Sequence, residues 1–392
     1  MELVKLAIQT LPFILCFSFI LSQQPIEHPY LNSAQPFFVP AILEEDSVMR
    51  SEFPRYILEM IDYEKSLTIS AAGDVTIGSD DSFGYHGTFH HEVEEQGLEH
   101  FGKNVKSIFE EDDLTIVNLE TTLTNSKEKA DKLFRFSGKP SYTEVLNLSS
   151  IEAVNLANNH TFDFLQRGYE DTIENLNKHH ISSFGYDRLF LEEVNGIKVG
   201  AIGYKGWSDT AEVREGIKRD IEKLRDNGAQ IIIANFHWGD ERHYHPNAVQ
   251  QSLGRYAIDV GADLVLGHHP HVVQGIEEYK DKFIVYSLGN FMFGGNRNPD
   301  DKDTFIFQQT FHFTFNELNN KQDIKIIPTR ISSLDNRNNY QPTPLEGEEA
   351  TRVLDKILSL SNKITDNEFA TDTYHLEENI AVFSNVVSSK PW

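Results

Sequence analysis

Three histidines lie within four positions of the chain, at His268, His269 and His271, in the segment V-L-G-H-H-P-H-V-V-Q-G. Imidazole side chains bind divalent metals, and they titrate close to neutral pH. The spacing therefore leaves three interpretations open: a metal centre, a pH-sensitive patch, or ordinary surface histidines. The choice depends on which other polar residues the fold brings to the same place.

Polar side chains recur at the ends of short apolar runs along the chain. These runs predict buried strands over 66–74, 114–120, 151–160, 197–204, 230–237, 262–269 and 282–290. Helices are predicted between several of them, at Tyr169 to His179, Thr210 to Asn227 and Ala248 to Val260. Strands that alternate with helices indicate an α/β fold, in which ligands gather outside the carboxyl ends of the strands. One shared site at these ends is the simplest explanation of the polar residues.

The residues at the strand ends are of types that bind divalent metals. Carboxylates, carboxamides and imidazoles together suit Mn, Fe, Zn or Mg. Two metals sharing a bridging carboxylate would need about this many groups, and such a pair activates a water for hydrolysis. Each residue alone can be explained as an ordinary turn or core residue, but coincidence is a poor explanation for the whole set. The set is Asp74, Asn118, Glu120, Asn158, Asn159, His160, Asp163, His237, His268, His269 and His271.

Charge and composition narrow the classes of function. The 392 residues carry a formal net charge of −25 at pH 7, which argues against nucleic acid or anionic lipid as a partner. The single cysteine, Cys16, excludes an intrachain disulfide and a cysteine-based zinc site. A polyanionic substrate would be repelled, unless bound cations or a local basic patch offset the field.

The N-terminal segment has the composition of an export signal. Lys5 precedes an apolar run from Leu6 to Leu21, which fits a secretory signal or a signal-anchor. A buried helix of the fold is the alternative. We therefore expect an exported protein that is extracellular, at the cell surface or anchored in the membrane. The predicted organisation is a signal peptide or anchor over 1–22, a spacer over 23–65, a main domain over 66–365 and a C-terminal tail over 366–392.

Six motifs follow one another in a fixed order within residues 66–365: G-D-V-T-I-G, V-N-L-E-T, N-L-A-N-N-H-T-F-D, H-W-G-D-E, G-H-H-P-H-V-V-Q and Y-S-L-G-N-F-M-F. Together they resemble the CapA family of poly-γ-glutamate capsule-synthesis proteins. The domain of that family is similar to calcineurin-like metallophosphoesterases. The resemblance implies an α/β fold of four layers, a β-sandwich flanked by helices. The sequence after about Gly294 itself predicts C-terminal strands, from alternating apolar residues, and then a helix from about Glu348 to Asn362.

The resemblance also implies roles for the matching residues. One or two divalent metal ions would be bound, with Asp74 on the first and Glu120 in the bridging position. His160 would act as an acid or anion stabiliser, oriented by Asp163. The remaining metal ligands would be Asn159, His237, His269 and His271, and the substrate contacts would be Asn118, His268 and Asn290. Thr76 and Glu120 stand where the phosphoesterase pattern has His and Asp, which predicts a weak first metal site or a mononuclear centre.

The sequence leaves two classes of function open within this family. The first is an exported metal-dependent hydrolase or transferase that acts on poly-γ-glutamate, a phosphoester or a related cell-surface substrate. The second is a non-catalytic subunit that binds the anionic polymer within a membrane synthesis complex, with membrane synthase subunits as partners. A general metal-dependent phosphoesterase is a third interpretation, which Thr76 disfavours. We expect a role in the biosynthesis or export of a capsular polymer in either of the first two cases.

Overall fold

The structure is a computed structural model that describes residues 64–369, 371, 374–377 and 379–383. The export segment predicted over 1–22 lies outside these residues, as does the predicted spacer up to residue 63. No helix in the described part of the chain combines the length and the apolar character needed to cross a membrane.

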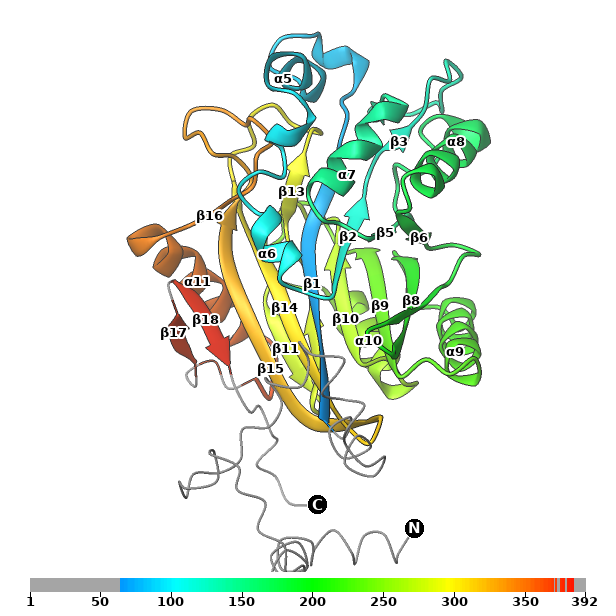
Figure 1. Cartoon of the computed structure of the whole chain (residues 1–392), viewed down its shortest axis with the longest axis vertical. Helices are drawn as coiled ribbons and strands as arrows, with labels where there is room; N and C mark the ends of the chain where they lie inside the picture. Colours follow the sequence, from blue (N-terminus) through cyan, green and yellow to red (C-terminus); the bar gives the residue numbers. More distant parts are fainter. Residues whose placement is uncertain (1–63, 370, 372–373, 378, 384–392) are drawn as a thin grey trace, which may run out of the picture. The chain divides into compact units, whose positions relative to one another are not determined.

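Two β-sheets pack face to face at the centre of the domain (Figure 1). Within the described residues, the first sheet has the order β17-β18-β15-β14-β1-β2-β5-β6, with β13 beside β1 and β16 beside β15. The second has the order β11-β12-β10-β9-β8-β7. The first contains β1 (Glu64–Thr76), β2 (Leu114–Leu119), β5 (Ala153–Asn155), β6 (Ser182–Phe184), β13 (Asn290–Phe293), β14 (Asp303–Thr314), β15 (Glu317–Arg330), β16 (Thr343–Pro344), β17 (His375–Glu377) and β18 (Ile380–Phe383). The second contains β7 (Phe190–Val194), β8 (Ile197–Gly206), β9 (Ile231–Trp238), β10 (Leu264–His268), β11 (Ile276–Tyr279) and β12 (Lys282–Val285), while β3 (Thr122–Leu123) and β4 (Ser137–Gly138) form a separate pair.

Helices cover the outer faces of both sheets, so the sandwich has the four layers expected. Successive side chains of a strand point to opposite faces of its sheet. In β9, Ile231 and Ile233 pack in the core between the sheets, whereas Ile232 and Ala234 pack in a second core with α9 (Ala211–Asp226) and α10 (Ala248–Asp259). The outer face of the first sheet packs against α5 (Phe89–Gln96), α6 (Lys106–Glu110), α7 (Glu144–Leu148) and α8 (Leu165–Lys178).

The helix boundaries follow local capping chemistry. The Thr210 side chain accepts a hydrogen bond from the Val213 amide and begins α9. Asn247 and Gln250 form a reciprocal capping box at the start of α10. Both helices begin and end within one residue of the ranges predicted from the sequence.

The structure divides one predicted strand between the two sheets and adds two strands near the C-terminus. The run 282–290 was expected to be one strand, but β12 belongs to the second sheet and β13 to the first. The chain changes sheets at Gly289, which has a φ of +76° that residues with a Cβ rarely adopt. Residues 366–392, expected as a tail, contain β17 and β18, and β18 pairs with β15. These two strands are too short for a pattern in the sequence to identify them.

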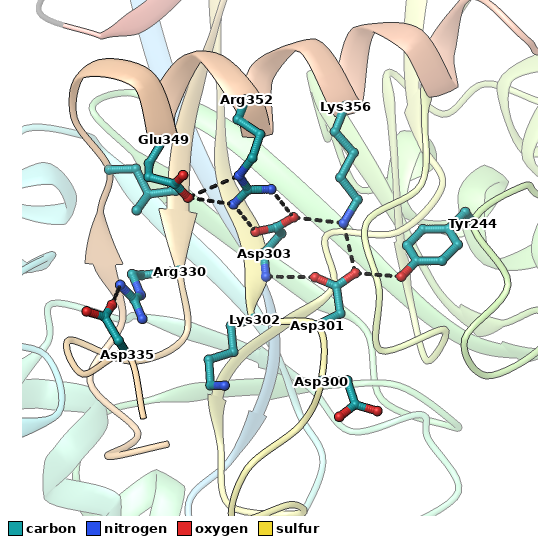
Figure 2. A pocket seen from close by; sticks show the side chains of 11 residues that line it. Tyr244, Asp300, Asp301, Lys302, Asp303, Arg330, Asp335, Glu349, Arg352 and Lys356 are labelled. Carbon is teal, nitrogen blue, oxygen red and sulfur yellow. Dashed lines mark hydrogen bonds and ion pairs between the residues drawn. The ribbon is translucent and has the colours of Figure 1, made fainter. Parts of the chain in front are cut away.

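The C-terminal helix α11 (Gly347–Ser361) packs against β15 and contributes Val353 and Ile357 to the core between the sheets. Ion pairs also fix it to the beginning of β14 and the residues just before it (Figure 2). Arg352 forms a bidentate pair with Asp303 at 2.7 and 2.9 Å, and Lys356 lies 2.8 Å from both Asp301 and Asp303. These groups line a polar cleft of about 500 Å³ that contains none of the predicted site residues. Its acidic groups are thus largely neutralised by its own bases.

Candidate metal centre

The first sheet presents a row of polar side chains near the carboxyl ends of β1, β2 and β5 and at the beginning of the parallel strand β13. Asn290, Asp74, Asn118 and Asn155 are successive register partners on β13, β1, β2 and β5. All four are nearly or fully buried. Asn155 donates to Asn118 Oδ1 at 3.0 Å, and Asn118 donates to Asp74 Oδ1 at 2.8 Å. The ladder of amides fixes the position of the Asp74 carboxylate.

The second sheet presents a matching row on the facing side. Lys205, His237 and His268 are register partners on β8, β9 and β10, so their side chains share one face of the sheet. That face meets the first row, because His237 Nδ1 lies 3.2 Å from Asn118 Nδ2 and His268 Nδ1 lies 3.6 Å from Asp74 Oδ1. The site therefore forms where two parallel sets of strands end opposite each other.

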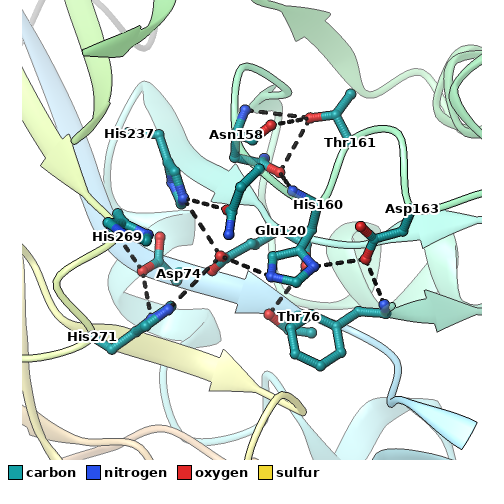
Figure 3. A network of polar contacts seen from close by, with 12 residues as sticks. Asp74, Thr76, Glu120, Asn158, His160, Thr161, Asp163, His237, His269 and His271 are labelled. Atoms are coloured by element: carbon teal, nitrogen blue, oxygen red, sulfur yellow. Dashed lines mark hydrogen bonds and ion pairs between the residues drawn. The ribbon is translucent and has the colours of Figure 1, made fainter. Parts of the chain in front are cut away.

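Glu120 follows β2 and lies at the centre of the site (Figure 3). Within the described residues, both of its carboxylate oxygens are buried without a hydrogen-bond partner. Three imidazole nitrogens surround Oε1: His237 Nε2 at 3.5 Å, and His160 Nε2 and His271 Nε2 at 3.8 Å. An unsatisfied buried carboxylate is costly unless a proton or a cation accompanies it.

The donor set fits a divalent cation. Glu120, His269 and His271 each place one ligand atom within 4.8 Å of the others. His269 Nδ1 is also buried without a hydrogen-bond partner in the described part of the chain. Mixed imidazole and carboxylate ligands are suitable for transition metals and do not identify the metal.

The His269-Pro270-His271 turn has an unusual backbone. His269 has a φ of 95° and His271 a φ of 58°, in the region that residues other than glycine rarely occupy. Three contacts to neighbouring residues support this turn: the His269 amide donates to Asp74 Oδ2 at 3.2 Å, and His271 Nδ1 lies 3.2 Å from Asp74 Oδ2 and 2.9 Å from Asn290 Oδ1. Strain of this kind is retained where the surroundings hold a side chain in a required orientation.

His160 occupies the opposite side of Glu120. Its Nδ1 lies 2.6 Å from Asp163 Oδ2, and Lys132 Nζ contacts the other Asp163 oxygen at 2.7 Å. Phe136 stacks on the imidazole at a centroid distance of 4.2 Å. The ring is thus fixed with its Nε2 toward Glu120 and its Nδ1 toward Asp163.

Burial controls the proton affinity of these groups. Burial raises the pKa of Glu120 well above its ordinary value, and Asp74 and Asp163 raise it further against the opposing effect of His271. Burial disfavours the charged form of a histidine too, and it lowers the pKa of His269 to about 4. For His271 burial acts in the same direction, but Glu120 and Asp74 outweigh it and raise the pKa to about 9. The two carboxylates therefore favour a positive charge beside them, a requirement that a metal ion also meets.

A family model decides the relationship of this chain to known proteins. Residues 68–295, more than half of the chain, match the model described as bacterial capsule synthesis protein PGA_cap. The chain belongs to the PGA_cap family. This match agrees with the resemblance to CapA proteins seen in the six motifs.

Named relatives of this PGA_cap protein include two from Bacillus. The capsule biosynthesis protein CapA of Bacillus anthracis is 29% identical over 264 residues, which cover 60% of this chain and 62% of that protein. The PGA biosynthesis protein CapA of Bacillus subtilis is 30% identical over 231 residues, or 53% of this chain and 61% of that protein. The chain thus spans about three fifths of the length of these two relatives.

More distant relatives share less with this family member. A probable polyglutamine synthesis accessory protein of Mycobacterium tuberculosis is 27% identical over 210 residues, covering 45% of this chain and 55% of that protein. Among solved structures, a hypothetical protein from Thermus thermophilus aligns with a TM-score of 0.39 at 15% identity, covering 64% of this chain and 96% of that chain. A likeness of this size carries no information about function.

The structure brings the predicted site residues of this PGA_cap protein into one contiguous network, but it changes the place of some. Asn118 and His268 were expected to contact substrate, yet they are 0% and 1% exposed and lie between the sheets. Alternation along β2 and β10 directs both side chains inward. Asn290 is 3% exposed and bonds to His271. In the structure these three residues contact Asp74 or His271, and their role as substrate contacts stays a prediction. Thr76, which replaces the histidine of the phosphoesterase pattern, donates to the Glu120 carbonyl at 3.3 Å.

Four residues of the site were not identified from the sequence. Asn155 ends the same run that leads to Asn159, but its role in the amide ladder depends on strand register. Lys132 and Phe136 come from a segment with no motif of its own. Trp207 follows β8 directly, and its ring lies 4.6 Å from that of His269. Of these four residues, only Trp207 could have been found from the sequence, because it comes just after a predicted strand.

Proposed function

We propose that this chain takes part in the synthesis or export of a capsular polymer of the poly-γ-glutamate type, through metal-dependent hydrolysis of the polymer or of its linkage. Membership of the PGA_cap family and the names of the Bacillus relatives support the polymer role. The buried Glu120 carboxylate, unpaired in the described structure and surrounded by three imidazoles, supports the chemistry. A purely structural core would pair such a carboxylate with hydrogen-bond donors.

Glu120, His269 and His271 would hold the metal, with Asp74, Asn159 and His237 as further ligands. When bound, a divalent ion polarises a carbonyl or phosphoryl oxygen and lowers the pKa of water. Asp74 is kept ionised although burial opposes it, because His271 and Asn118 lower its pKa by hydrogen bonding and charge. Asn159 Oδ1 lies 2.7 Å from His237 Nε2, so these two candidate ligand atoms are adjacent.

His160 is placed to move a proton. Because the Asp163 carboxylate accepts from Nδ1, the neutral ring keeps its free electron pair at Nε2, on the side of Glu120. Hydrolysis of a γ-glutamyl amide forms a carbon–oxygen bond and breaks the carbon–nitrogen bond. Nε2 would accept the proton of the attacking water and then transfer it to the leaving nitrogen.

The metal content of the purified full chain tests the chemical part of this proposal. We expect one or two equivalents of a transition metal in the wild type, and its loss in Glu120→Ala and His269→Ala. His243→Ala is the matched control, since His243 is exposed and its ring bonds only to the nearby Glu241 carbonyl in the described structure. Folded wild-type protein that takes up no Mn, Fe or Zn would exclude the metal-dependent mechanism.

Polymer production by a capsule-deficient strain separates the two classes of function. Glu120→Ala should fail to restore the polymer if the site is catalytic, whereas the His243→Ala variant should restore it. Normal polymer production by a metal-free Glu120→Ala protein would contradict hydrolysis and favour a non-catalytic subunit. Equal amounts of both variants in the cell, measured by immunoblot, are the necessary control.

A further inference from the structure

Lys205 shares the polar row of the second sheet with two predicted site residues. It is the register partner of His237 on the neighbouring strand, and His237 is in turn the partner of His268. Unlike these two histidines, Lys205 is exposed at the end of β8. Its ammonium group lies 5.4 Å from the centre of the Tyr186 ring, and Tyr186 donates from its hydroxyl to the Asn158 carbonyl at 2.9 Å. Lys205 thus borders the loop that carries Asn159 and His160.

The charge of Lys205 is unmatched by an anion. In the described residues it forms no ion pair or hydrogen bond, whereas the neighbouring Lys132 pairs with Asp163 at 2.7 Å. Partial burial, with a contribution from the charge of Lys132, lowers the pKa of Lys205. An anionic ligand would relieve this unfavourable environment. The chain has a net charge of −25, so a lysine beside the candidate metal centre with no anionic partner among the described residues is a local exception.

An aromatic surface lies next to this cation. Trp207, two residues along the chain, is 43% exposed. Its ring packs edge-to-face with the rings of His269, at 4.6 Å between centroids, and His237, at 5.7 Å. A large exposed indole against predicted metal ligands offers an apolar surface to the methylene groups of a substrate.

The opposite side of the site has the opposite charge. The loop after β9 carries the exposed Asp240 and Glu241, and the Arg242 amide of the same loop donates to the Pro270 carbonyl at 2.8 Å, which places this loop beside the His269–His271 turn. An anionic group of a substrate would be repelled from that loop and attracted toward Lys205. The charge distribution therefore favours one orientation of a bound anionic substrate, with its anionic group toward Lys205.

We propose that Lys205 binds a free α-carboxylate of a γ-linked glutamyl chain beside the metal centre, while Trp207 packs against the methylene groups of the same residue. This inference rests on the proposed function, since it assumes that the chain acts on such a polymer. It adds a carboxylate-binding site that selects an acidic over an amidated chain.

Calorimetric titration of the metal-loaded full chain with two oligomers tests the inference. One is a γ-linked glutamate pentamer with free α-carboxylates, and the other is the same pentamer with every α-carboxylate amidated. We expect the wild type to prefer the acidic pentamer, and Lys205→Gln to bind it about tenfold more weakly, as expected for one charge-assisted contact. Lys205→Arg should retain the preference. Lys198→Gln, an exposed lysine at the other end of β8, should behave as the wild type.

Each outcome decides a different point. A Lys205→Gln variant that keeps the full preference for the acidic pentamer would overturn the role of Lys205 and leave the proposed function intact. Wild-type protein that binds both pentamers equally would overturn the carboxylate site in the same way. Wild-type protein that binds neither would contradict the polymer role itself and the inference with it. Unchanged melting temperature and metal content of the variants exclude loss of the fold as the cause.

Discussion

His160 shows how one buried pair of contacts sets the chemistry of a single residue. Burial lowers the pKa of its imidazole, the Asp163 carboxylate acts against this effect, and the charge of Lys132 adds to it. The hydrogen bond to Asp163 also fixes which ring nitrogen faces Glu120. The proton affinity of His160 is therefore a property of this small cluster and not of the histidine alone.

Two substitutions should move the pKa of His160 in opposite directions. Asp163→Asn removes the negative charge and should lower the pKa further, whereas Lys132→Met removes a positive charge and should raise it. NMR titration of the His160 ring in metal-free protein measures both shifts. Shifts of the same sign in the two variants would contradict the arrangement of these three residues.

At the scale of elements, the position of Asp74 depends on the close approach of β1 to the chain before β13. The Asp74 amide donates to the Gly289 carbonyl at 2.9 Å. A Cβ atom at Gly73 would lie 2.1 Å from the same carbonyl oxygen. The backbone would have to move to relieve this steric clash. Gly73 thus allows Asp74 and Asn290 to share one polar row.

Gly73→Ala should therefore separate β1 from β13. We expect a loss of about 2–3 kcal/mol of unfolding free energy, as for an overpacked core, together with weaker metal retention. Urea denaturation and metal analysis measure the two effects. Ser66→Ala, at the exposed beginning of the same strand, is the control and should change neither. Full stability of Gly73→Ala would show that the two segments can adjust without cost.

At the scale of the whole molecule, the buried histidines link stability to pH. Burial lowers the pKa of His268 from 6.5 to about 4. In the unfolded chain this residue binds a proton near pH 6.5, whereas in the folded chain it binds one only near pH 4. The contribution of the neutral His268 ring to the free energy of unfolding is therefore fully present above about pH 6.5. It is lost as the pH falls toward 4, which amounts to about 3 kcal/mol for this one group.

His268→Gln should flatten the dependence of stability on pH in this window. With metal removed by a chelator, the difference in unfolding free energy between pH 7 and pH 4 should be smaller in the variant than in the wild type by about 3 kcal/mol. Urea denaturation at a series of pH values measures it. The exposed His245→Gln variant should keep the wild-type slope. An unchanged slope in His268→Gln would mean that this ring is protonated in the folded protein.

The sequence by itself determined the family, the fold class and the region of the site. Apolar runs that end in polar residues identified most of the strands, because the carboxyl ends of parallel strands meet at one edge whatever the details of packing. The motifs then identified Glu120 and His269 among the residues at that edge. These features depend on local pattern, which a sequence displays directly.

Only the tertiary structure decided which of these side chains are buried and which residues from distant parts of the chain they contact. Strand alternation placed Asn118 and His268 inside the sandwich, although their positions at strand ends had suggested contact with substrate. The division of 282–290 between two sheets, and the meeting of Lys132 with Asp163, join segments that are distant along the chain. The row that contains Lys205 likewise depends on the register of separate strands. Register and sheet stacking are set by the whole core, so no local pattern contains them.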